Sequence, residues 1–181
     1  MAEIWTIGHS NRSLNDFLGL LQSQNIAALA DVRRFPGSRR YPHFNQEDLA
    51  KSLAGVGIEY RHFPELGGRR RARADSPNPA WRNAAFRGYA DYMMTPEFET
   101  AVRDLLKLGE KKRTAIMCAE VLWWQCHRAL ISDFLKAQDH RVFHILGPNK
   151  VEEHPFTSAA QIVGGKLSYA APRASEPELE F

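Results

Sequence analysis

Short apolar runs that alternate with helix-like segments constrain this fold more than any other feature of the sequence. Five runs have the length and composition of buried strands, and they span residues 4–7, 26–32, 58–63, 114–118 and 142–146. The second run is apolar on both faces until Asp31, a pattern typical of parallel strands covered on both sides. Between the runs, apolar residues recur at helical spacing, as they do from Leu14 to Leu21 after the capping residue Ser13.

The intervening segments complete the predicted order of elements. Further helices are expected over residues 46–54, 81–94, 96–108 and 124–138, with a short one near 158–161 and a turn at 164–165. Proline and glycine make residues 33–43 and 64–79 loops, and the second is long enough to indicate a functional or disordered segment. Strands alternating with helices predict a single α/β domain over residues 1–171, with a mostly parallel sheet between two helical layers. A frayed tail is expected at residues 172–181.

The composition excludes several classes of protein. The chain has 181 residues, of which 44% are hydrophobic and 25% charged, as is ordinary for a globular domain. No apolar run approaches the roughly 20 residues that cross a bilayer, and the N-terminus lacks the layout of a secretory signal. With two cysteines, the chain fits a reducing compartment that leaves thiols free. We therefore expect a cytoplasmic protein with no membrane partner.

Arginines are concentrated in the two predicted loops. The first loop carries Arg33, Arg34, Arg39 and Arg40, and the second carries Arg69, Arg70, Arg71 and Arg73. Because the planar guanidinium group matches phosphate and carboxylate, this pattern favours an anionic small molecule or a nucleic acid as partner. The second loop would close over such a ligand or follow its phosphate backbone. The alternative is a solvated, flexible face.

The candidate site is expected at the carboxyl ends of the strands, where open parallel sheets bind their ligands. Residues at or just beyond those ends are His9, Ser10, Asn11, Asp31, Arg33, Cys118 and Glu120. Cys126, His127 and Arg128 begin the next predicted helix, and Ser38 and Arg39 lie in the neighbouring loop. These side chains are therefore predicted to face one crevice.

Anion binding is the first chemistry that this group suggests. A strand–loop–helix unit directs free backbone N–H groups and the positive end of the helix dipole at the crevice. Arg33, Arg39 and Arg128 would add charge-assisted hydrogen bonds, most naturally to phosphate. The alternative is local pairing of these arginines with Asp31 and Glu120.

Acid–base and thiol chemistry are also open. Glu120 or Asp31 can serve as general acid or base. Cys126, expected in a first helical turn beside His127 and Arg128, has surroundings that favour a thiolate. The spacing does not match the anion-binding loop of a cysteine phosphatase or a rhodanese, which weakens a nucleophilic role.

The two cysteines leave open a metal site or a thiol redox pair. Cys118, Cys126 and His127 are weak metal ligands, because the gap of eight positions differs from zinc knuckles and neighbours on a helix diverge. Nothing in the sequence identifies a cofactor. Trp123 and Trp124 either stack on a planar substrate or cover the core.

Several ungapped strings resemble the prokaryotic family called domain of unknown function 488. They run over residues 6–12, 31–39, 66–68 and 86–92, then through Cys118-Ala-Glu and Cys126-His-Arg, and on into the tail from His154 to Tyr169. The resemblance covers nearly the whole chain and implies a single α/β domain whose signature residues form one site. It implies no reaction.

The leading hypothesis is an enzyme acting on a phosphate-bearing substrate, a hydrolase or a transferase on a nucleotide or nucleic acid. Arg33, Arg39 and Arg128 would bind the anion, and Glu120 or Asp31 would transfer protons. The alternatives are a non-catalytic nucleotide or nucleic-acid-binding module, and a thiol redox or metal sensor that uses Cys118 and Cys126.

Overall fold

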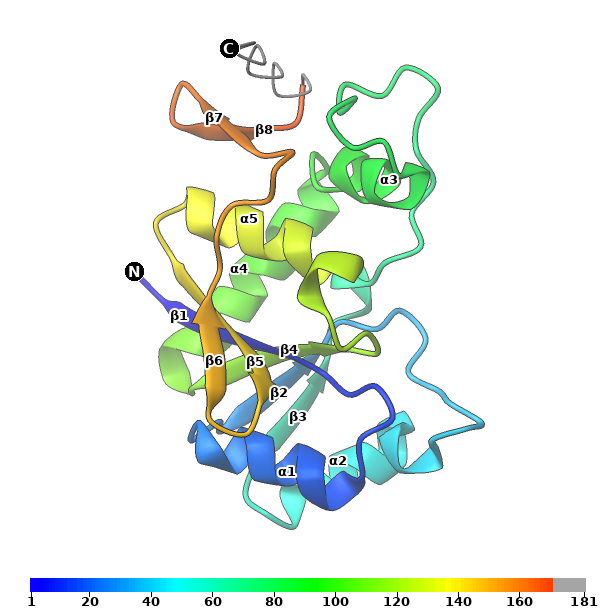
Figure 1. The fold of residues 1–181 in the computed structure, drawn as a ribbon, viewed down its shortest axis with the longest axis vertical. Coiled ribbons are helices and arrows are strands. Elements are labelled where there is room, and N and C mark those ends of the chain that lie inside the picture. The colour runs from blue at the N-terminus through cyan, green and yellow to red at the C-terminus, as the bar shows by residue number, and fades with distance from the viewer. Residues whose placement is uncertain (171–181) are drawn as a thin grey trace, which may run out of the picture.

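The central sheet follows the apolar runs. A computed structural model describes residues 1–170, and six of its strands form one mixed sheet in the order β3–β2–β4–β1–β5–β6 (Figure 1). The parallel strands are β1 (Glu3–Gly8), β2 (Ala28–Asp31), β3 (Glu59–His62), β4 (Thr114–Cys118) and β5 (Arg141–Gly147). The edge strand β6 (Lys150–Glu153) is antiparallel to β5 and was not predicted. The expected α/β fold with a mostly parallel sheet is confirmed.

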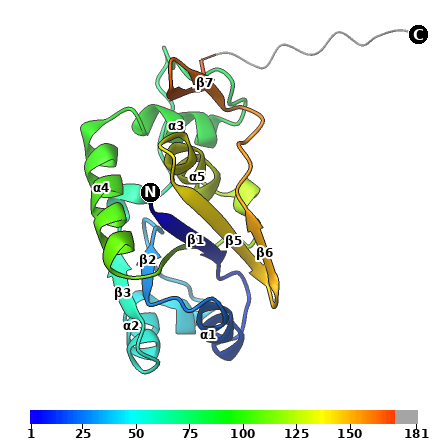
Figure 2. The same cartoon turned by 90° about the vertical axis from the view of Figure 1, so that its left-hand side faces the viewer.

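Helices cover both faces of the sheet (Figures 1 and 2). On one side lie α1 (Leu14–Ser23) and α2 (Gln46–Ala54); on the other lie α3 (Ala84–Tyr92), α4 (Pro96–Lys111) and α5 (Arg128–Ala137). Alternation along β1 produces this division, because Trp5 and Ile7 pack with the first pair of helices whereas Ile4 packs with the other three. Cys118 points to the α5 side, which decides its neighbours in the site.

Capping residues begin the helices largely as the sequence predicts. The Ser13 hydroxyl accepts the N–H of Asp16 at 3.0 Å, and Thr95 caps α4 with its hydroxyl. Asn45 precedes α2, but its side-chain oxygen accepts the Ser38 N–H at 2.6 Å instead of capping the helix. This contact ties the first arginine-rich loop to the start of α2.

The helix expected over residues 124–138 is shorter than predicted. Residues 123–125 form a 3-10 turn, η3 (Trp123–Gln125), which the Cys126 N–H extends by donating to the Trp123 carbonyl. Cys126 therefore has an extended backbone ahead of α5, and His127 is the N-cap. The placement of Cys126 in a first helical turn was wrong, because the buried Trp123 stacks on His144 and holds the chain in this turn.

Other boundaries also differ from the prediction. Helix α3 begins at Ala84 rather than near residue 81, because Asn83 accepts the N–H groups of the two residues that start it. Helix α4 runs past Gly109, which packs tightly on Ile4 instead of ending the helix. The helix expected near residues 158–161 was wrong. A hairpin of β7 (Gln161–Val163) and β8 (Lys166–Ser168) stands there, turning through two glycines with positive φ.

Within residues 1–170, no helix has both the length and the apolar character needed to cross a membrane. The long loop predicted over residues 64–79 contains only the 3-10 turn η2 (Pro64–Leu66) and is otherwise irregular. The tail predicted at residues 172–181 lies outside the described residues.

Candidate functional site

A crevice of about 810 Å³ lies where β1, β2 and β4 end. Its walls are the loops after these strands, the arginine-rich loop after β3 and the segment before α5. The predicted residues that line it are His9, Ser10, Asn11, Arg33, Ser38, Arg69, Cys118, Glu120, Cys126 and His127. Most of the predicted site residues are therefore brought together.

Part of the lining was not among the predicted site residues. Those additional residues are Arg34, Phe35, Gly37, Arg40, Tyr41, Gly68 and Ala119. The signal for Arg34 and Arg40 was present, since both belong to the first arginine cluster. The sequence could not show the role of Gly68. In the structure, a Cβ at this position would lie 3.1 Å from Nδ1 of His127.

Five predicted residues lie outside the crevice lining, namely Asp31, Arg39, Arg70, Arg71 and Arg128. The Arg70 guanidinium stacks 3.7 Å from the ring centroid of Tyr92 and donates to the Gly67 carbonyl, so it is engaged within the protein. Of the three consecutive arginines in the second loop, only Arg69 contributes to the lining. The side chains of consecutive loop residues diverge, which the sequence cluster could not show.

The buried carboxylate of Asp31 holds Arg33 in place. One Asp31 oxygen accepts the backbone N–H and Nε–H of Arg33 at 3.1 and 2.9 Å, and the other accepts Nη2–H at 2.7 Å. Tyr60 donates its hydroxyl to the second oxygen at 2.5 Å. Asp31 is fully buried and all its contacts are internal, so it orients the guanidinium rather than exchanging protons with a ligand.

The imidazole of His9 forms the next contact of Arg33. Nδ1 of His9 donates to the Ser10 carbonyl at 2.9 Å, which leaves Nε2 to accept from Nη1 of Arg33 at 3.4 Å. The ring also stacks on Phe44, with 4.4 Å between centroids. Burial, together with the Arg33 charge, lowers the pKa of His9 to about 4, so the ring is neutral at pH 7.

The two cysteines meet at the crevice. Their Sγ atoms lie 2.7 Å apart, and Nδ1 of His127 is 3.4 Å from Sγ of Cys126. His127 donates from Nε2 to the Val32 carbonyl at 3.0 Å, so Nδ1 carries the lone pair and can take a proton from Cys126. Burial lowers the pKa of His127, which favours this neutral tautomer.

The thiols differ in acidity. Burial opposes ionisation of Cys126, but the hydrogen bond between the two sulfurs and the charge and N–H groups of Arg128 outweigh it and lower the pKa of Cys126 to about 7. Burial, with the neighbouring Cys126 thiolate, raises the pKa of Cys118. The thiolate therefore resides on Cys126.

Arg128 acts from beneath the crevice. It is 1% exposed, donates Nη1–H to the Thr6 hydroxyl at 3.0 Å, and donates Nη2–H to the Glu120 carbonyl at 2.6 Å. Arg128 does not line the crevice, and its direct contact with an anion stays a prediction. Its contacts shape the loop after β4, and its charge helps to lower the pKa of Cys126. That loop packs on Gly8, where a Cβ would lie 1.8 Å from the Glu120 oxygen.

The remaining side chains of the loop after β4 differ in their exposure to solvent. Glu120 is exposed and lines the crevice. Trp123 is buried, stacks on His144 with centroids 4.5 Å apart, and donates its indole N–H to Glu152 at 2.6 Å. Trp123 thus covers the core, whereas Trp124 is 48% exposed.

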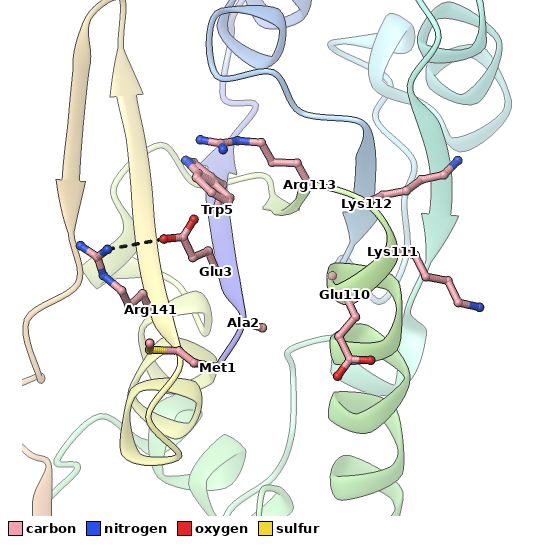
Figure 3. A pocket seen from close by; sticks show the side chains of 10 residues that line it. Met1, Ala2, Glu3, Trp5, Glu110, Lys111, Lys112, Arg113 and Arg141 are labelled. Atoms are coloured by element: carbon pink, nitrogen blue, oxygen red, sulfur yellow. Dashed lines mark hydrogen bonds and ion pairs between the residues drawn. The ribbon is translucent and has the colours of Figure 1, made fainter.

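A second hollow, of about 620 Å³, lies at the opposite end of the sheet (Figure 3). Arg141 pairs there with Glu3, and Arg113 stacks 3.7 Å from the ring centroid of Trp5. These cations are occupied by internal contacts, so the crevice at the carboxyl ends is the stronger candidate. Across residues 1–170, no three His, Cys, Asp or Glu side chains converge as a metal site.

A family model described as Domain of unknown function DUF488 matches residues 13–135. The match includes the first arginine cluster, the glycines after β3 and the segment from Cys118 to Arg128. The similar strings at residues 6–12 and 154–169 lie outside it. No curated protein and no solved structure matches the chain.

Proposed function

The chain belongs to the DUF488 family, and we propose that its crevice is the active site of an enzyme acting on a phosphate-bearing substrate, a nucleotide or a nucleic acid. One observation carries the proposal: four arginines and an acidic thiol line the same crevice. The arginines are Arg33, Arg34, Arg40 and Arg69.

The arginines supply different kinds of contact. Arg33 is pre-oriented by Asp31, so binding an anion costs it little side-chain entropy. Arg34, Arg40 and Arg69 are exposed and can adapt to the ligand. Because Asp31 balances the charge of Arg33, three arginines remain against the one carboxylate of the lining, Glu120, which leaves the crevice attractive to phosphate.

Cys126 is the nucleophile of the proposed reaction. Nδ1 of His127 takes the proton of the Cys126 thiol, the thiolate sulfur bonds to phosphorus, and the bond from phosphorus to the leaving oxygen breaks. The leaving oxygen then takes that proton. Glu120, exposed in the same crevice, acts as general base for the water that cleaves the sulfur–phosphorus bond.

A thermal-shift screen of nucleotides, short oligonucleotides and phosphosugars tests the binding step. A ligand that binds only the folded state at 100 times its Kd stabilises it by about 2.7 kcal/mol. Arg40→Gln and Arg69→Gln should weaken that stabilisation. The matched control is Arg103→Gln, which removes the same charge from an exposed site on α4. Equal losses in the control would contradict a specific anion site.

The catalytic step is tested with the ligand that the screen identifies. Glu120→Gln should retain binding, lose turnover and accumulate phosphate on Cys126, detected by mass spectrometry. Unchanged turnover would remove Glu120 from the reaction.

The second candidate is a non-catalytic nucleic-acid-binding module, favoured by the exposed arginines alone. It predicts binding without turnover in the unmodified chain and an affinity that falls steeply with salt.

A further inference from the structure

We propose that Cys126 and Cys118 react with a hydroperoxide and close a reversible disulfide between them. This inference does not rest on the phosphate-bearing substrate, because it concerns the two sulfurs and their surroundings. It assigns the cysteine pair an oxidation chemistry of its own.

The geometry of the pair is the first support. Cys118 ends β4, and Cys126 stands between η3 and α5, so two separate elements bring the sulfurs to 2.7 Å. A disulfide bond is about 2.05 Å long, so the sulfurs need to approach by only about 0.7 Å.

The two thiols have unequal chemical roles. The Cys126 thiolate is the nucleophile, since Arg128 lies beside it and the Cys118 sulfur is 2.7 Å away. Cys118 keeps its proton because it is buried against apolar neighbours. An acidic thiol beside a protonated partner is the arrangement in which one sulfur is oxidised and the other resolves it.

The crevice gives an oxidant access to the two sulfurs. Cys118 and Cys126 are 2% and 5% exposed, and both line the crevice, which is their route to solvent. A hydroperoxide is small enough to reach Cys126 by that route. The arginines of the crevice stabilise the departing hydroxide.

The steps balance as follows in atoms and electrons. With hydrogen peroxide, the Cys126 thiolate attacks one oxygen, the O–O bond breaks, and the products are a sulfenic acid and hydroxide. The Cys118 thiol then attacks the sulfenic sulfur, a water molecule leaves, and the disulfide forms. Its proton and the one that Cys126 lost complete two waters, so the thiols lose two electrons and the peroxide gains two.

The test uses the full chain, reduced, freed of reductant and treated with stoichiometric hydrogen peroxide. We expect both free thiols to disappear, the mass to fall by two hydrogens and peptide mapping to join Cys118 to Cys126; dithiothreitol should reverse the change. The reaction should be about tenfold faster at pH 8 than at pH 6, as the thiolate fraction of a thiol with a pKa of about 7 requires. Thiols that persist, or cross-links only between chains, would overturn the proposal.

Two variants separate the roles of the sulfurs. In Cys118→Ser, the sulfenic acid on Cys126 should persist and be trapped by dimedone, whereas Cys126→Ser should leave Cys118 unreactive. The opposite pattern would refute the assignment. If either variant fails to fold by circular dichroism, the peptide map of the unmodified chain still decides whether the pair closes. Anion binding is measured on the reduced chain, so its failure is distinguishable from failure of the disulfide.

Discussion

Unfolding measurements can test how strongly the buried Asp31 carboxylate holds Arg33 in the crevice. Asp31→Asn preserves the shape of the side chain and removes its charge. The carboxylate now accepts three N–H groups of Arg33 and the hydroxyl of Tyr60. An amide can accept at its oxygen only, so its NH₂ group would face donors on one side of this cluster.

Asp31→Asn should destabilise the folded chain, because it leaves the buried Arg33 guanidinium without its charged partner. Arg33 is 8% exposed, and removing one partner of a buried ion pair costs about 3–5 kcal/mol. For a domain of this size, each kcal/mol lowers Tm by about 2–4 °C, so Asp31→Asn should lower Tm by about 6–20 °C.

A double-mutant cycle measured by urea unfolding checks this reasoning. The four proteins are the unmodified chain, Asp31→Asn, Arg33→Met and the double variant. We expect the double variant to lose at least about 2 kcal/mol less than the sum of the single losses, because it leaves no uncompensated charge. A loss below about 1 kcal/mol for Asp31→Asn, or strict additivity, would refute the idea that the carboxylate holds Arg33 electrostatically.

Three further predictions concern neighbouring parts of the site. The pKa of His9 is about 4 when folded and near 6.5 when unfolded, so below pH 6 the unfolded chain binds a proton that the folded chain does not. The free energy of unfolding should therefore have its full value above pH 6.5 and fall by about 1.4 kcal/mol per pH unit down to pH 4. His9→Gln should remove that part of the pH dependence, measured by urea unfolding at each pH. Gly8→Ala should unfold or severely destabilise the chain, because its Cβ would overlap a carbonyl 1.8 Å away, whereas Gly19→Ala meets no neighbour and should stabilise α1 by about 1 kcal/mol in the same assay. Arg128→Gln should raise the pKa of Cys126, and the pH profile of iodoacetamide alkylation should move upward accordingly.

The sequence predicted the layers of the fold because its apolar periodicity is local. Parallel strands covered on both faces are continuously apolar, and the run before Asp31 reads that way without any knowledge of its partners. Two adjacent glycines also predicted the turn at residues 164–165, although not the hairpin strands on either side. The brief edge strand β6 alternates weakly and carries charge, so its pairing depends on β5 rather than on its own composition.

The site was harder to predict because its chemistry depends on which side chains are buried next to one another. The rule on strand ends grouped Cys118, Glu120 and Cys126 correctly, since it needs only the order of elements. It could not tell that Asp31 turns inward to Arg33, or that Arg128 points beneath the crevice. Those outcomes are set by contacts between residues far apart in the chain. The periodicity of apolar residues reports only local structure and cannot predict such contacts.

A chain of buried hydrogen bonds begins at Arg128 under the crevice. A guanidinium can only donate, so the Thr6 hydroxyl accepts from Arg128 and donates in turn to Nδ1 of His144 at 2.6 Å. Nε2 of His144 must then carry a hydrogen and donate to Nδ1 of His154 at 2.9 Å, and His154 donates to Asp133 at 2.8 Å.

The donor Arg128 at one end and the acceptor Asp133 at the other fix the direction of every hydrogen bond in this chain. Burial lowers the pKa of His144 to about 2, so the ring relays polarity without taking charge itself. The carboxylate of Asp133 also accepts from the hydroxyls of Thr157 and Tyr169, which brings the segment after β6 into the same network. The matched region of the family ends at residue 135, yet the groups that polarise Thr6 toward Arg128 come from β5 and beyond. Cutting the network at His154 should therefore disturb the acidity of Cys126, although His154 does not line the crevice.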